Sequence, residues 1–241
     1  VATGLIINQL VAEGNTVQVT SAAGLIRDDG TDPDIDAASV VLTGNVAPGL
    51  GVGTLEIDGN LDLAGETVTF EIDGYAGAGI DPNGHDQIVV TGTVDLTGAT
   101  LDTTGSDIVG TSLGDIFVIV DNDGTDAITG TFAGLAEGDS VTVNGQNFRI
   151  FYSAGDGNDV ALVAVPGPVG TIYVDDSFTQ NDGQAIADAD LGTTGSQGAV
   201  MGVNAFATLG EAVASIASGG NIIVNGGTYA ETISLADSVT L

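Results

Sequence analysis

Aliphatic and polar side chains alternate in the stretch Leu55-Glu56-Ile57-Asp58-Gly59-Asn60-Leu61-Asp62-Leu63. Successive side chains of a β-strand point to opposite faces, so the alternation predicts a strand with one buried and one solvated face. Glycines at strand ends allow tight turns that need a positive φ. We therefore expect stacked strands, in which each layer buries its apolar face only against its neighbours.

The composition of the whole chain agrees with this prediction. The 241 residues include 38 glycines, and 43% of the residues are hydrophobic. Short β-branched runs separated by Gly, Asp and Asn are typical of an all-β protein with many tight turns. A mean hydropathy of +0.34 is too high for a disordered acidic tail. The sequence has no cysteine, which excludes disulfides and thiolate sites.

The charge of the chain is extremely one-sided. Thirty-three acids, 26 of them Asp, stand against two bases, Arg27 and Arg149, and the formal net charge is -31. Such a surface repels phosphate backbones and anionic lipid, so we expect neither nucleic-acid binding nor direct membrane insertion. It attracts cations, and calcium is the predicted cofactor. The same features lead us to expect an extracellular protein of a bacterial cell surface.

Residues 48–163 resemble the passenger-associated strand repeat of autotransporter-type adhesins. The resemblance rests on the turn Pro48-Gly49, the following Gly53-Thr54-Leu55, the alternating strand after it, and a late Gly-rich strand over 157–162. It implies a solenoid-like surface module that is not an enzyme.

Residues 171–241 resemble the N-terminal entry of a pectate-lyase-like right-handed β-helix. The matching segments are 171–175, 205–213 and 219–232. In that family a short helix plugs the open end of the solenoid core, and the polysaccharide lyases use calcium with an Arg or Lys base. Because no base follows Arg149, the resemblance implies the scaffold and not the activity.

The capping helix, expected near 205–217, also follows from the residues. Four apolar side chains recur at spacings of three and four and share one helix face. They are Phe206, Leu209, Val213 and Ile216. Asn204 is the predicted N-cap, and Gly219 and Gly220 are predicted to end the helix.

These observations predict that the chain is divided into four segments. Residues 1–45 are expected to be short terminal strands of a β module, including strands at 17–19 and 24–26, in a β-helix or a β-sandwich. Residues 46–165 form the repeat-like β module, and 166–170 a Pro/Gly linker. Residues 171–241 are the capping helix and the first rung of a β-helix. The predicted fold class is all-β, with β-solenoid-like and β-sandwich-like modules.

Two Asp-rich turns are candidate calcium sites, because calcium prefers hard oxygen ligands gathered by a tight turn. One has Asp121, Asp123 and Asp126 around a turn glycine, and the other spans 28–36. The candidate ligands in the second are Asp28, Asp32, Asp34 and Asp36. The first turn lacks the Glu of an EF-hand loop, since Phe132 stands there. An Asp-rich hairpin without metal remains the alternative for both turns.

Two further motifs have structural interpretations. Residues 155–160 resemble one unit of the calcium-binding nonapeptide of the repeats-in-toxin family. That family stacks many copies and this chain has one, so a plain turn is expected. His85 lies in a turn-rich segment, where we expect a solvated surface histidine.

The expected function is a non-catalytic structural or adhesive module of a large secreted bacterial surface protein, stabilised by calcium. One alternative is a self-assembling subunit of an extracellular filament or surface layer, joined head-to-tail through open strand edges or solenoid ends. Another is a carbohydrate-binding or carbohydrate-cleaving β-helix, with a surface polysaccharide as partner. The absence of Trp and the scarcity of other aromatic residues give this last alternative few sugar-binding platforms.

Overall fold

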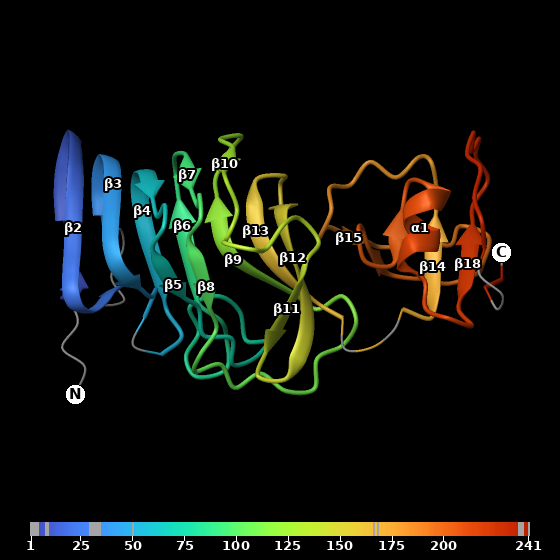
Figure 1. The fold of residues 1–241 in the computed structure, drawn as a ribbon, viewed down its shortest axis with the longest axis horizontal. Coiled ribbons are helices and arrows are strands. Elements are labelled where there is room, and N and C mark those ends of the chain that lie inside the picture. Colours follow the sequence, from blue (N-terminus) through green and yellow to red (C-terminus); the bar gives the residue numbers. More distant parts are fainter. Residues whose placement is uncertain are drawn as a thin grey trace.

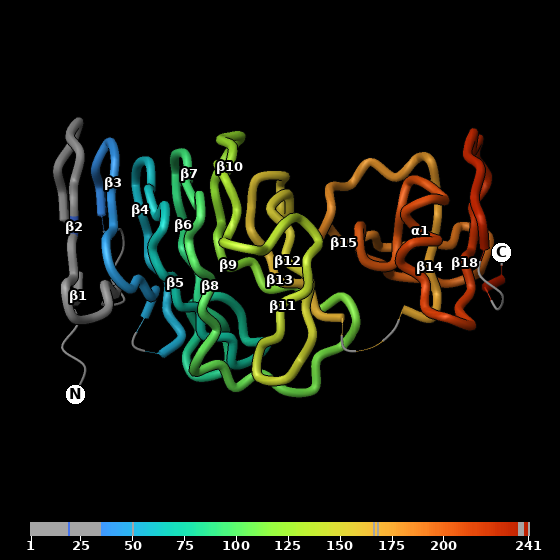
Figure 2. Tube along the Cα trace, in the orientation of Figure 1, coloured from blue at the N-terminus to red at the C-terminus, as the bar shows by residue number. Residues whose placement is uncertain are grey.

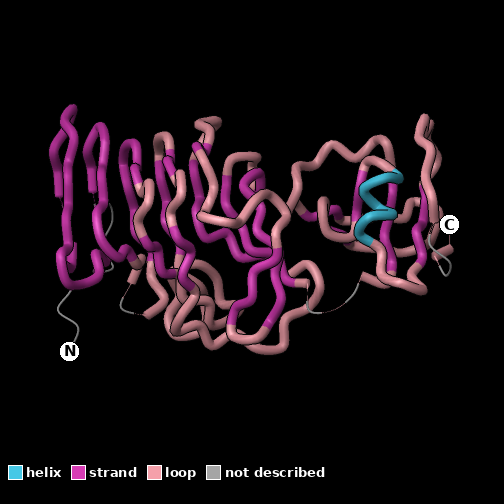
Figure 3. Tube along the Cα trace, viewed as in Figure 1, coloured by secondary structure: helices cyan, strands magenta, loops and turns pink. Residues whose placement is uncertain are grey.

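The computed structural model describes residues 5–7, 10–28, 35–49, 51–165, 167, 169–235 and 239–240. Side chains are described for Val19 and for these residues from 35 onward. The chain is all-β, with one short helix among the described residues (Figure 3). It advances steadily along the long axis, from the N-terminal strands at one end to the C-terminal strands at the other (Figure 2).

Most strands belong to one 13-stranded, curled sheet. Its members are β1 (Leu5–Ile7), β2 (Leu10–Asp28), β3 (Ile35–Val46), β4 (Thr54–Asp62), β5 (Thr67–Thr69), β6 (Gln87–Val90), β7 (Val94–Asp95), β8 (Thr100–Asp102), β9 (Ile116–Asn122), β10 (Ile128–Thr129), β11 (Ser140–Val143), β12 (Gln146–Ala154) and β13 (Asp159–Ala164). The remaining elements are β14 (Thr171–Val174), β15 (Ala185–Ile186), β16 (Ala199–Val200), β17 (Ala205–Phe206), α1 (Leu209–Ser215) and β18 (Asn221–Val224).

The N-terminal part of the large sheet is parallel. The strands β1, β2, β3, β4, β6 and β9 pair in this order (Figure 1). Leu55 pairs with Ile88, Leu61 with Val94 and Thr67 with Thr100, an offset of 33 residues each time. A constant offset at three places means that residues 87–102 follow the path of residues 54–69. The parallel pairs on either side of these two segments have other offsets, 22 residues for Ile35 with Ile57 and 32 for Ile88 with Val120.

The predicted alternation in residues 55–63 is confirmed. Leu55, Ile57, Leu61 and Leu63 are buried in the main core, whereas Asp58 and Asn60 are exposed. The next segment repeats the arrangement with Ile88, Val90, Val94 and Leu96. Fully burying an aliphatic side chain contributes about 1.5–3 kcal/mol, so these inward-facing rows hold the stacked segments together.

The N-terminal strands differ from the prediction. The short strands expected at 17–19 and 24–26 are parts of the single long strand β2. Its register against β3 shifts between Ala12 and Thr16 and again between Thr20 and Leu25. Such irregularities let a paired strand bend without ending, which explains why the turn-forming residues here do not interrupt it.

After β9 the sheet continues with antiparallel pairs. β13 pairs with β9, β12 with β13, and β11 with β12. All six residues of β13 are buried, because the strand lies between β9 and β12 and is covered on both faces. The last strands of the parallel stack are therefore β9, on β6, and the short β10, on β7.

The C-terminal part contains a second small parallel sheet, in which β14 lies between β17 and β18. The predicted helix exists but is shorter: α1 begins after Thr208 and ends at Ser215. Asn204 is not its N-cap. Ala205 and Phe206 pair with β14, so the chain is still extended there.

The capping residue is Thr208, whose hydroxyl accepts from the backbone N–H of Glu211 at 3.3 Å and donates to its carboxylate at 2.6 Å. The predicted apolar face is confirmed in its packing. Leu209, Val213 and Ile216 pack on the cluster that contains Phe206.

The two sides of the 166–170 segment touch each other. Phe151 and Val163 of the large sheet share a buried cluster with Val200 and Val203. Arg149 Nη1 donates to the carbonyl oxygen of Gly202 at 3.0 Å. Among the described residues, no helix is long and apolar enough to cross a membrane.

Candidate functional site

The predicted calcium turn at 121–126 follows directly after β9. Asp121 is half-buried, whereas Asp123 and Asp126 are exposed. The structure does not gather their three carboxylates into a metal site, and in the described part of the chain no group of three or more His, Cys, Asp or Glu side chains could hold a metal ion. Asp126 contributes its backbone carbonyl to the turn instead.

A second turn, between β12 and β13, lies against the first. The pairing of Val120 with Val160 places the end of β9 beside the start of β13. The backbone N–H of Asn122 donates to Asp159 Oδ1 at 2.8 Å. The Asn122 Nδ2 and Asn158 Nδ2 atoms both donate to the Asp126 carbonyl oxygen, at 2.6 Å and 2.7 Å.

We call the residues that meet here the two-loop cluster. Its members are Asp121, Asn122, Asp126, Asp156, Asn158 and Asp159. Asn122 is fully buried and Asn158 is 8% exposed. The side-chain oxygens of both, Asn122 Oδ1 and Asn158 Oδ1, are buried and have no hydrogen-bond partner. Buried polar atoms are rarely left without a partner, so these two oxygens need an explanation.

The surroundings of the two-loop cluster disfavour the ionised form of its carboxyl groups. The pKa of Asp159 is raised to about 6, mainly by burial and also by the carboxylates of Asp121 and Asp156, although hydrogen bonds from the backbones of Asn122 and Asp156 lower it. The pKa of Asp121 is also raised, by burial and by the charges of Asp156 and Asp123. At neutral pH the cluster therefore holds partly desolvated carboxylates that repel one another.

The second predicted site divides between different parts of the structure. Asp28 is the last residue of β2 and Asp36 is the second residue of β3, so both belong to strands and not to the predicted loop. Asp36 is half-buried and pairs in register with Asp58 of β4. Asp32 and Asp34 lie outside the described residues.

His85 and Asp86 form a buried polar pair that the sequence did not reveal. The expectation of a solvated histidine is wrong: His85 is 8% exposed, stacks edge-on against Phe117 and lies 3.2 Å, through Nε2, from the Val118 carbonyl oxygen. Burial lowers its pKa. The turn residues around it indicated a surface loop, but that loop folds back over the sheet.

Asp86 connects two segments through its carboxylate. Its Oδ1 accepts from the backbone N–H of Gly53 at 2.8 Å, and its Oδ2 accepts from the N–H of Glu71 at 2.7 Å. Burial raises the pKa of Asp86 to about 7 despite these two bonds. Asp86 thereby satisfies the backbone donors of Gly53 and Glu71 and holds these two segments together, which is a structural role.

Many other aspartates fix turns. Asp62 Oδ1 accepts from the N–H of Ala64, Asp95 Oδ1 from that of Thr97 and Asp102 Oδ1 from that of Thr104. Each bond closes an Asx turn, in which the side chain takes the place of a backbone acceptor. Asp95 and Asp102 have lowered pKa values, to which these hydrogen bonds contribute. The Asp bias of the composition thus has a structural cause at these turns that needs no metal.

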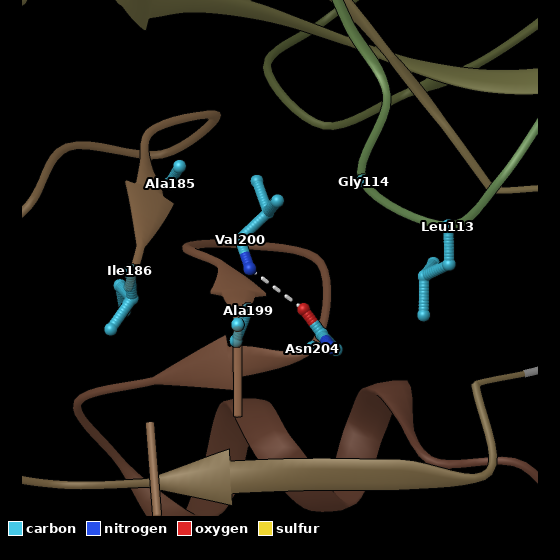
Figure 4. A pocket seen from close by; sticks show the side chains of 8 residues that line it. Leu113, Gly114, Ala185, Ile186, Ala199, Val200 and Asn204 are labelled. Carbon is cyan, nitrogen blue, oxygen red and sulfur yellow. Dashed lines mark hydrogen bonds between the residues drawn. The ribbon is translucent and has the colours of Figure 1, made fainter. Parts of the chain in front are cut away.

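An open apolar pocket of about 270 Å³ lies where the large sheet meets the segment after β14 (Figure 4). It is lined by Leu113, Gly114, Ala185, Ile186, Gly198, Ala199, Val200 and Asn204. The side-chain oxygen of Asn204 already accepts from the N–H of Val200 at 2.8 Å. This lining offers hydrophobic contact and contains no acid, base or nucleophile.

Comparisons with protein-family models, curated proteins and solved structures find no match for this chain. The two-loop cluster has a partial sequence signal, because residues 121–126 and 155–160 both resemble parts of calcium-binding loops. Their proximity was not predictable, because it depends on the antiparallel pairing of β9 with β13.

Proposed function

We propose that this chain is a non-catalytic structural module of a large secreted bacterial surface protein, and that its stacked parallel segments are the coils of a β-solenoid. The single observation that supports it best is the constant 33-residue offset of the pairs Leu55–Ile88, Leu61–Val94 and Thr67–Thr100. A stack of such coils is a stiff rod whose length grows with the number of coils. A rod of this kind serves to hold an adhesive element away from a cell surface.

The position of Arg149 supports a structural role over a lyase-like one. It is the one base whose side chain is described, and its guanidinium donates to the Gly202 carbonyl between the large sheet and the C-terminal part. A lyase would need a base free to remove a proton from a sugar. The apolar pocket near Val200 also lacks the charged groups that would recognise an acidic polysaccharide.

The shape of the particle in solution tests the proposal. A compact protein of 241 residues has a radius of gyration of about 18 Å. We expect small-angle X-ray scattering of the monomer in chelator to give a larger radius and a rod-like profile. We also expect no binding on a glycan array and no cleavage of polygalacturonate. A compact profile would contradict the rod, and turnover of a polysaccharide would replace it with an enzyme.

One feature favours the filament alternative as a second candidate. β2 spans 19 residues, but only its last three pair with β1, and its remaining backbone has β3 on one side alone among the described residues. An open parallel edge is a template for another strand. Association that depends on concentration in light scattering, abolished by Val17→Pro, would favour strand addition between copies. A monomer at every concentration would exclude it.

A further inference from the structure

Hydrogen bonds fix the two amide groups whose side-chain oxygens lack a partner in the two-loop cluster. Each amide donates through Nδ2 to the Asp126 carbonyl, so Asn122 Oδ1 and Asn158 Oδ1 are the atoms left over. A buried acceptor without a partner costs about 1–3 kcal/mol. Such an oxygen is satisfied by a hydrogen-bond donor, such as a water molecule, or by a cation.

The carboxylates around these amides distinguish a cation from water. Asp159 is 6% exposed, Asp121 precedes Asn122 in the chain, and Asp156 lies in the same turn as Asn158. Arg149 is occupied with Gly202. A water molecule would satisfy the amide oxygens but would leave the mutual repulsion of the carboxylates unchanged. A cation would satisfy the amide oxygens and would also reduce the repulsion between the carboxylates.

We propose that the two-loop cluster binds one calcium ion between the turn at 122–126 and the turn at 154–159. The ligands are the side-chain oxygens of Asn122 and Asn158 and the carboxylate of Asp159. Asp121 and Asp156 supply further negative charge, and water completes the coordination. This set differs from the predicted carboxylates of Asp121, Asp123 and Asp126, of which only Asp121 takes part through its side chain.

The types of ligand favour calcium over other metals. Calcium accepts six to eight oxygen ligands, including amide oxygens, in irregular geometry, whereas magnesium requires a near-ideal octahedron. Zinc and copper prefer nitrogen and sulfur ligands, which the cluster lacks. Because two ligands are amides, the site needs fewer than three carboxylates as direct ligands.

The site would join two parts of the fold. Asn122 ends β9, which pairs with β6 in parallel, and Asp159 begins β13, the antiparallel neighbour of β9. Beyond them, the Gly155 carbonyl accepts a hydrogen bond from Gln184 of the segment after β14. Calcium would therefore stiffen the junction between the stacked coils and the C-terminal part.

Calorimetric titration with CaCl2 tests the proposal on the whole chain, after treatment with chelator. The buffer should contain about 0.3 M NaCl, because salt screens the loose attraction of cations to an acidic surface. We expect one strong binding event in the wild type and at least a tenfold weaker one in both Asn158→Ala and Asp159→Asn. The control Asp107→Asn removes an equal charge from an exposed loop and should bind like the wild type.

Thermal unfolding gives a second readout and shows that the variants fold. Calcium should raise the Tm of the wild type and of Asp107→Asn. In chelator, Asp159→Asn should unfold at the wild-type temperature or above it, because a repelled carboxylate is gone, and added calcium should not raise its Tm. Equal calcium effects in all variants, or none in the wild type, would overturn the proposal and leave buried water on the two amides. The scattering test in chelator concerns the rod alone, so the two proposals can fail separately.

Discussion

Gly59 and Gly92 stack at the same corner of successive segments, 33 residues apart. A Cβ on Gly92 would lie 2.8 Å from the Gly59 carbonyl oxygen and 2.4 Å from Asn60 Oδ1. One on Gly59 would lie 1.7 Å from the carbonyl oxygen of Ala37 in the preceding strand, and Gly59 also has a φ of 141°. At this corner the backbones of neighbouring segments thus approach each other so closely that neither glycine leaves room for a Cβ.

The corner predicts that Gly59→Ala is strongly destabilising. The added methyl group must push two paired strands apart and the backbone must hold an unfavourable φ, so we expect a loss of about 2–4 kcal/mol in the free energy of unfolding. Chemical denaturation followed by circular dichroism measures this loss. Gly226→Ala is the control, since its Cβ would meet nothing within 4 Å and its φ is ordinary. Equal stabilities of the two variants would show that the segments do not approach so closely.

The rows of inward-facing aliphatic side chains predict that replacing a buried leucine by alanine lowers the stability far more than replacing an exposed one. Leu61 is 2% exposed and Leu191 is 72% exposed. Leu61→Ala should cost about 2–5 kcal/mol because it leaves a cavity between stacked segments. Leu191→Ala should stay within about 0.5 kcal/mol of the wild type. Denaturation midpoints of the two variants check this, and similar losses would contradict the buried position of Leu61.

Asp86 predicts that part of the stability is lost as pH rises. Its pKa of about 7 in the folded state lies above the ordinary value of 3.8, because the side chain is buried and faces the charges of Glu71 and Asp73. The folded state therefore binds the proton more tightly than the unfolded state. Its contribution is fully present below pH 4 and is lost as pH rises to about 7, with a slope of up to about 1.4 kcal/mol per pH unit.

Free energies of unfolding measured between pH 4 and pH 8 test this dependence. Asp86→Asn should show a clearly smaller slope than the wild type, whatever its absolute stability. Asp107→Asn should keep the full slope, since that carboxyl is exposed. If both variants keep the wild-type slope, the pH dependence arises from other carboxyls, of which Asp159 is the first to test.

Local patterns in the sequence predicted the fold where a single strand determines the outcome. The alternation from Leu55 to Leu63 was sufficient to predict which side chains are buried, because it depends only on the pleat. The 33-residue offset also has a trace in the sequence, because the similar turns Asp62-Leu63-Ala64-Gly65 and Asp95-Leu96-Thr97-Gly98 are 33 residues apart.

Long-range contacts were not predictable in the same way. The burial of His85 depends on a loop that folds back over Phe117, and the two-loop cluster depends on the pairing of β9 with β13. Neither contact leaves a local pattern. For the Asp-rich turns the sequence leaves calcium and a metal-free hairpin both open, and the Asx turns at Asp62 and Asp95 are formed by local chemistry without a metal.

The start of α1 provides the last prediction. The sequence Thr208-x-x-Glu211 has the pattern of a capping box. In the structure the Thr208 hydroxyl accepts from the backbone N–H of Glu211 and donates to the Glu211 carboxylate. Losing an N-cap costs about 1 kcal/mol, so Thr208→Ala should loosen α1 without unfolding the large sheet. Hydrogen exchange of the Ala212 and Ile216 amides, which bond within this helix, should accelerate about fivefold. Thr194→Ala, in an exposed loop, should leave these rates unchanged. Unchanged rates in Thr208→Ala would mean that packing of Leu209 and Val213 on Phe206, and not the cap, fixes the helix.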